Sequence, residues 1–231
     1  MITLRRSEER GATKTPWLDS KHTFSFADYH DPAFVGFGAL RVINEDWITG
    51  EAGFPPHPHR DMEIVTYILE GALQHRDSGG GGGTIRPGEI QRMSAGSGVV
   101  HAEFNAARER CHLLQIWILP SRQGIAPSYE QKTLDIAAIT NKFARIAGPD
   151  PQPTEVRLVQ DAEIWATRLD ADIEVIHPLA PGRRVWVQVA KGEITLGEET
   201  LKAGDAAAVT DQDQVVICSK APSEVLLFDL A

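Results

Sequence analysis

The chain has 231 residues, a hydrophobic content of 42% and a formal net charge of −9, which suits a globular protein of one large or two small domains. The excess of acidic side chains argues against direct nucleic-acid binding, because contacts with a phosphate backbone need a basic face. The longest apolar runs have the length of strands and are far too short to cross a membrane.

The N-terminus and the cysteines favour a cytoplasmic protein. The chain begins MITLRRSEERG, where charges are followed by no apolar segment, so we expect no signal peptide. The two cysteines, Cys111 and Cys218, lie far apart in strand-like runs, which does not favour a disulfide framework. We therefore expect a reducing compartment and no association with a membrane.

Strand-like runs dominate the chain from end to end, and helical periodicity is weak everywhere. Glu70-Gly71 and the five consecutive glycines from Gly79 to Gly83 are turn signals between these runs. No Gly-Lys-Ser/Thr follows the glycines, so they predict a loop tip and not a phosphate-binding loop. In chain order, β-branched and aromatic residues predict strands at 38–43, 62–69, 73–77, 90–93, 99–104, 113–119, 185–189, 215–218 and 225–228.

An internal repeat indicates two related domains. The segment 67–73, followed by a Pro-Gly-Glu turn, returns as 187–194, followed by an Ala-Gly-Asp turn. Each copy reads as a strand, a glycine turn, a second strand and a turn of glycine and acid, which is a repeat at the scale of a domain.

A linker-like segment, GPDPQP, begins at Gly148. We therefore predict an N-terminal domain over residues 1–147 and a C-terminal domain over residues 148–231. The second domain is short for a barrel, so we expect a strand near Ile2 to Arg5 to complete it.

Two short patterns share one spacing, namely His57 with His59 and His101 with Glu103. In a strand, alternate side chains leave the same face, so each pair would point in one direction. Two such strands facing each other would bring three imidazoles and one carboxylate to one point, which is a ligand set for a divalent transition metal. This set leaves coordination positions open for chemistry at the metal.

The remaining histidines have a structural interpretation, because a lone histidine on an apolar strand is usually a packed residue with a satisfied ring nitrogen. His22 and His75 could instead support the metal ligands from behind. The C-terminal half lacks a comparable ligand set and predicts a barrel without metal. The histidines interpreted in this way are His22, His30, His75, His112 and His177.

The arrangement of these residues resembles the two motifs of the cupin superfamily. The first motif is matched by His57, His59, Glu63 and Gly71, and the second by the pattern G-x-x-H-x-x-x-N over 98–105. A Pro-Gly-Glu turn lies between them. The resemblance implies an all-β bicupin fold, in which two antiparallel β-barrel (jelly-roll) domains contain few short helices.

The N-terminal half further resembles the pirin family, and most of all its shorter bacterial members described as quercetin 2,3-dioxygenases. The resemblance covers roughly residues 1–130 with specific motifs and 155–231 more diffusely. The segments that carry it are WLDS (17–20), HTFSFADYHDP (22–32), GFGALRVINED (36–46), HPHRDMEIVTYILEG (57–71), MSAGSGVVHAEFN (93–105) and LLQIWILP (113–120).

The two resemblances differ on the fourth ligand. The general cupin pattern assigns this role to Glu63, and the pirin pattern assigns it to Glu103. The spacing of two residues favours Glu103, which would lie beside His101 on one face of a strand. Glu63 stays the alternative, because its distance of four residues from His59 has the same parity.

The resemblance implies a metal-dependent, ring-cleaving dioxygenase that opens a flavonol such as quercetin with O2 and releases carbon monoxide. Glu103 would act as the general base at the 3-hydroxyl. Fe(II) is the expected metal, with Cu, Zn, Mn, Ni and Co as alternatives. The expected partners are a small aromatic substrate and O2, and the expected state is a monomer or weak oligomer.

Two other functions stay open at this point. One is a dioxygenase that acts on another hydroxylated aromatic compound. The other is a pirin-like binding protein that senses redox state through its metal or acts as a co-regulator, without direct contact to nucleic acid.

Overall fold

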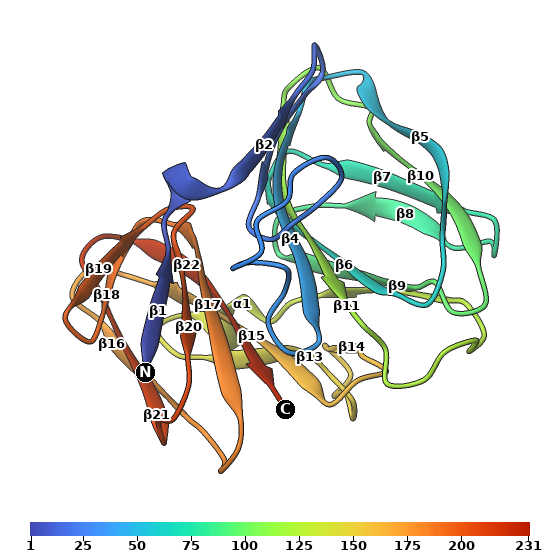
Figure 1. The fold of residues 1–231 in the computed structure, drawn as a ribbon. Helices are drawn as coiled ribbons and strands as arrows, with labels where there is room; N and C mark the ends of the chain where they lie inside the picture. Colours follow the sequence, from blue (N-terminus) through green and yellow to red (C-terminus); the bar gives the residue numbers. More distant parts are fainter.

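The computed structural model describes residues 1–231 and is almost entirely β, with two seven-stranded and two four-stranded sheets (Figure 1). The single α-helix, α1 (Ile136–Ile139), has four residues, and a 3-10 turn, η1 (Ser7–Glu9), follows the first strand. No helix has the length and apolar character that crossing a bilayer requires. The predicted all-β class is confirmed.

In the N-terminal half, a large antiparallel sheet faces a small one. The large sheet has the spatial order β12 (Ser128–Thr133), β9 (Glu89–Ser94), β6 (Glu63–Glu70), β11 (Cys111–Ile118), β4 (Leu40–Ile48), β3 (Leu18–His22) and β2 (Gly11–Lys14). The small sheet has the order β5 (Ala52–His59), β10 (Val99–Asn105), β7 (Leu73–Asp77) and β8 (Gly82–Ile85).

The C-terminal half repeats this plan. Its large sheet has the order β1 (Ile2–Arg5), β20 (Ala206–Val209), β17 (Arg184–Lys191), β22 (Ser223–Leu230), β15 (Ala162–Leu169), β13 (Ala144–Gly148) and β14 (Val156–Arg157). Its small sheet has the order β16 (Glu174–Pro178), β21 (Gln214–Ser219), β18 (Glu193–Leu196) and β19 (Glu199–Lys202). The N-terminal strand β1 pairs with β20, as expected from the shortness of this half.

The division of the chain into 1–147 and 148–231 stays a proposal, and strand pairing favours an earlier boundary. β12 pairs with β9 in the N-terminal sheet, whereas β13, which begins at Ala144, pairs with β15 in the C-terminal sheet. The chain therefore changes sheets before the GPDPQP segment, whose first residue, Gly148, is the last residue of β13. Strand pairing, rather than the linker-like composition of GPDPQP, therefore marks where the chain passes from the N-terminal sheets to the C-terminal ones.

The two large sheets pack against each other and form the main hydrophobic core. This core joins side chains of both halves, for example Tyr67 and Leu114 of the first with Trp186 and Phe228 of the second. Burial of one such large side chain contributes about 1.5–3 kcal/mol. The contact between the halves is therefore a continuous core, and each half buries further apolar residues inside its own pair of sheets.

Strand β6 lies between the barrel interior and this shared core, which explains why seven of its eight residues are buried. Its alternate side chains divide between the two sides. Ile64 and Ile68 face the barrel interior, and Val65 and Tyr67 face the C-terminal half. Glu63 has the parity of Val65 and Tyr67, so it too faces the C-terminal half.

Candidate metal centre

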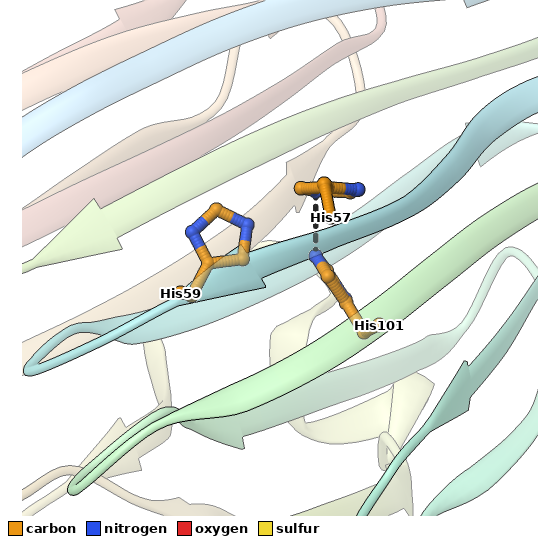
Figure 2. A group of neighbouring side chains, drawn as sticks. All are labelled: His57, His59 and His101. Carbon is orange, nitrogen blue, oxygen red and sulfur yellow. Dashed lines mark hydrogen bonds between the residues drawn. The ribbon is translucent and has the colours of Figure 1, made fainter.

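Three histidines meet where β5 pairs with β10 in the N-terminal half. Their ring nitrogens lie within 4.8 Å of one another, and Nε2 of His57 is 2.9 Å from Nε2 of His101. Figure 2 shows that His57 and His59 project from one strand and His101 from its neighbour. The pairing of the strands places His101 directly opposite His57 and Val99 opposite His59, so the predicted convergence of the three rings is what the structure shows.

The sequence of β5 suits only the edge of a sheet. The strand reads AGFPPHPH, and it pairs with β10 alone. Proline has no N–H to donate, so a strand with three prolines is restricted to an edge position. The position at the edge leaves the His57 and His59 side chains partly exposed, while His101, on the inner strand β10, is 2% exposed.

The protonation properties of the three rings are compatible with metal binding. Nδ1 of His57 lies 2.8 Å from the carbonyl oxygen of Pro55. A carbonyl only accepts, so Nδ1 carries a proton, and Nε2 is the ring nitrogen that faces the centre. Burial, followed by the charges of neighbouring histidines, lowers the pKa of His59 to about 4 and that of His101 to about 2. The donor set thus fits a divalent transition metal.

Glu103 lies beside this group but faces a different set of partners. Its carboxylate is grouped with His75 and His101, and not with His57 and His59. Both of its oxygens accept hydrogen bonds from Nε2 of Gln115, at 3.1 and 2.8 Å. Burial raises the pKa of Glu103 to about 7, although the bonds from Gln115 act in the opposite direction.

An irregularity in the ladder accounts for the position of Glu103. Its partner on β5 is Phe54, three residues before His57, although Glu103 is only two residues after His101. The extra residue on β5 falls at the consecutive prolines Pro55 and Pro56 and forms a bulge. Simple alternation on both strands would place Glu103 opposite a residue two positions from His57. Its role as fourth ligand therefore remains a proposal.

Glu63 belongs to neither group of metal-competent side chains. It is fully buried, accepts a hydrogen bond from Oγ of Ser94, and lies 3.4 Å from the backbone N–H of Val159 in the C-terminal half. Burial raises its pKa, with hydrogen bonds from Ser94 and Val159 acting against that rise. The parity argument from His59 does not apply, because the chain leaves β5 and turns through 60–62 before β6 begins.

The three histidines line a cavity of about 280 Å³ inside the N-terminal barrel. Three aromatic side chains, Phe26, Phe54 and Trp117, form part of its wall. Measured between ring centroids, Trp117 lies edge-on to His59 at 4.9 Å and Phe54 lies 6.2 Å from His57. Phe26 lies 5.5 Å from Trp117. The cavity is also lined by polar residues besides the three histidines, namely Thr13, Ser20, His22, Asn44, Asp46, Glu103 and Gln115.

The structure gives positions to two histidines, His75 and His22, whose role the sequence left open between packing and support of the metal ligands. His75 lies directly opposite Glu103 on β7, with its Nδ1 3.4 Å from Nδ1 of His101 and its Nε2 3.2 Å from Asp77, so it supports the centre from behind. His22 lines the cavity and bonds to Asn44 at 2.8 Å. In the sequence, the alternation of His75 with Asp77 along a predicted strand was the signal for the supporting role of His75.

The other two buried histidines have local partners outside the metal centre. Nε2 of His112 lies 2.9 Å from Glu45, and its ring stacks on Trp47. Nε2 of His177 lies 3.0 Å from Asp229 in the C-terminal half. Both therefore have the satisfied ring nitrogen that the structural interpretation requires.

Comparison with known proteins places this geometry in a family. The Pirin family model matches residues 4–118, and the model for the quercetinase C-terminal cupin domain matches residues 145–230. A relative named quercetin 2,3-dioxygenase, from Escherichia coli strain K12, is 47% identical over 231 residues, which is 100% of this chain and 99% of the relative.

Two solved structures from Escherichia coli have the same fold. That of YhhW is 46% identical, has a TM-score of 0.95, and matches 100% of this chain and 98% of that chain. That of the bacterial pirin YhhW in complex with nickel(II) is 45% identical, has a TM-score of 0.94, and matches 100% of this chain and 99% of that chain.

Proposed function

Because the chain belongs to the pirin family of two-domain cupin proteins, we propose that it is a metal-dependent dioxygenase that cleaves a flavonol such as quercetin. The observation that carries this proposal is the convergence of His57, His59 and His101 on one side of an aromatic-walled cavity. A relative that is 47% identical over the full chain has the name of this activity.

The three histidines would hold the metal, with Glu103 as the fourth ligand. Of the two glutamates considered, only Glu103 is grouped with one of these histidines, and Glu63 faces the C-terminal half. Binding of nickel(II) by a relative supports a site for a divalent transition metal. We propose Fe(II) as the native metal, because imidazole and carboxylate donors suit it and non-haem Fe(II) oxygenases bind their metal through these two kinds of donor.

The cavity favours a flat ligand. Its volume of about 280 Å³ lies just below the usual range for small-molecule pockets, roughly 300–1,000 Å³. The rings of Phe26, Phe54 and Trp117 would contact the faces and edges of an aromatic substrate. Their apolar surface would also exclude water from the reacting carbon atoms.

Glu103 would accept the proton of the 3-hydroxyl of the flavonol. It lines the cavity, and Gln115 fixes its orientation through two hydrogen bonds. The metal would supply Lewis acidity and a template for substrate and O2. Loss of the proton makes the ring electron-rich at C2, both atoms of O2 enter the opened product, and C3 leaves as carbon monoxide.

The test is oxygen consumption and carbon monoxide release by Fe(II)-loaded protein with quercetin. The matched control substrate is the corresponding flavone, which lacks the 3-hydroxyl and therefore has no proton for Glu103 to accept. We expect turnover of the flavonol only, and none with the His101→Ala variant.

Two outcomes would overturn the proposal. Turnover of another hydroxylated aromatic, but not of flavonols, would assign the site to a different dioxygenase substrate. Stoichiometric metal binding without turnover on a flavonol panel would favour the pirin-like binding protein whose metal responds to redox state.

A further inference from the structure

A second cavity, of about 630 Å³, lies in the C-terminal half. It occupies the part of the fold that corresponds to the metal centre. β16 follows β15 and forms the edge of its small sheet, as β5 follows β4 and forms the edge of the other (Figure 1). His177 is the histidine on this edge strand, and it lines the cavity.

His177 is held in one orientation by an acid. The residue is 4% exposed, and its Nε2 lies 3.0 Å from Oδ2 of Asp229. The other oxygen of Asp229 accepts a bond from Nε of Arg183. Burial would raise the pKa of Asp229, but the bonds from His177 and Arg183 outweigh it and hold that pKa below its usual value.

This arrangement leaves one acceptor without a partner. An ionised carboxylate only accepts hydrogen bonds, so Nε2 of His177 must donate to Asp229. In the neutral imidazole, Nδ1 then carries a lone pair. Nδ1 has no hydrogen-bonding partner in the chain, unlike Nε2. It is not one of the enclosed polar atoms without a partner, so it is accessible from the cavity that His177 lines. A ligand that satisfies Nδ1 must offer an O–H or N–H group.

Two aromatic rings flank His177. The ring of Trp165 lies 4.9 Å from it at an interplanar angle of 62°, and that of Phe143 lies 5.9 Å from it at 73°. Both line the cavity. Edge-to-face contacts at such distances suit a further aromatic ring.

Most of the charged side chains that line the cavity form ion pairs. Arg183 pairs with Asp161 and Asp229. Glu163 pairs with Arg145 and accepts a bond from Nε1 of Trp165. Lys142 and Glu174, one charge of each sign, also line the cavity and form no ion pair. Directly beside His177, Asp229 and Arg183 pair with each other, so this position favours an uncharged ligand over an ionic one.

We propose that the C-terminal barrel holds a second ligand site, for an uncharged aromatic ring that bears a hydroxyl group. The hydroxyl donates to Nδ1 of His177, and the ring packs against Trp165 and Phe143, which line the same cavity. The site contains no metal ligand set and is separate from the centre at His57, so it stands independently of the proposed dioxygenase activity.

The experiment measures binding of 4-fluorophenol to the full-length chain by fluorine NMR, with fluorobenzene as the probe that lacks the hydroxyl. The N-terminal centre is loaded with Zn(II), which is diamagnetic. His177→Phe removes Nδ1 but keeps a ring, and His57→Ala perturbs the other cavity. We expect saturable phenol binding that weakens roughly 10-fold in His177→Phe, persists in His57→Ala, and is at least about 10-fold tighter than that of fluorobenzene.

A second measurement needs no substitution. In the unaltered protein, the phenol ring protons should show nuclear Overhauser contacts with the indole protons of Trp165. Absence of saturable binding, absence of contacts to Trp165, or binding that His57→Ala abolishes and His177→Phe leaves unchanged would each overturn the proposal. The readout is binding, so a failure of flavonol turnover would not affect it.

Discussion

The Nε2 atoms of His57 and His101 lie 2.9 Å apart, although 44 positions separate the two residues in the chain. The ladder between β5 and β10 places them directly opposite each other. Two imidazole nitrogens at this distance need a proton or a cation between them, because facing lone pairs repel each other. The fold thus keeps together two of the three imidazoles that we propose as metal ligands.

Metal content should therefore be about one equivalent per chain, measured by elemental analysis after reconstitution with Fe(II). His57→Ala and His101→Ala each remove an imidazole from the group, and we expect affinity to fall by more than roughly 100-fold, which exceeds the usual effect of changing a supporting residue. His112→Ala is the matched control, since that ring bonds to Glu45 away from the centre. An equal loss in all three variants would contradict the assignment.

Glu103→Gln and Glu63→Gln should separate the two candidates for the fourth ligand. We expect Glu103→Gln to weaken metal affinity and abolish flavonol turnover, because an amide is a poorer ligand and a far weaker base. Glu63→Gln should change metal affinity by less than roughly 10-fold, the lower bound for residues that support a ligand, since Glu63 contacts Ser94 and Val159. Isothermal titration with Ni(II) gives both affinities, and the reverse order would assign the ligand to Glu63.

Asp229 should make stability depend on pH in the acid range. Its folded pKa lies below the ordinary value of 3.8, because bonds from His177 and Arg183 outweigh the effect of burial. A lowered pKa contributes stability that is fully present above 3.8 and is lost as the pH falls through the folded value. Asp229→Asn should therefore cost about 3 kcal/mol at neutral pH.

Chemical denaturation at several pH values measures this contribution. The difference between the unaltered protein and Asp229→Asn should shrink steadily as the pH falls below 3.8. Asp161→Asn is a suitable control, because that carboxylate also pairs with Arg183 but is 68% exposed. A difference that stays constant with pH would show that packing, and not charge, is the cause.

Tyr67→Phe should weaken the contact between the two halves. The Tyr67 hydroxyl, buried on β6, donates to Glu224 on β22, and Glu224 also accepts from Arg168 at 3.2 Å. The lost bond to a charged group is worth about 2 kcal/mol, and Arg168 prevents a larger loss by keeping Glu224 paired. The free energy of unfolding in guanidinium measures the effect.

Tyr129→Phe is the comparison for that variant. Tyr129 is half-buried, and its hydroxyl donates to the neutral side chain of Gln131 within the N-terminal half. We expect a loss of about 1 kcal/mol or less. Equal losses in the two variants would mean that the pair Tyr67–Glu224 makes no special contribution across the shared core.

The sequence by itself determined the fold class and indicated the three imidazoles that converge in the structure. Short runs of β-branched residues between glycine turns predicted an all-β chain, because alternation and turn chemistry are local properties. The spacing of His57 and His59 predicted a common direction for their rings, and the motif around His101 supplied the third. These inferences need only the geometry of one strand at a time.

The tertiary structure decided the rest, because it depends on which strands pair and in which register. Glu63 and Glu103 both had even parity along the chain, yet the turn before β6 directs Glu63 to the shared core, and a bulge at the β5 prolines shifts Glu103 relative to His57. His75 joined the centre only through the pairing of β7 with β10. Register is a property of two strands together, so no single run of residues could reveal it.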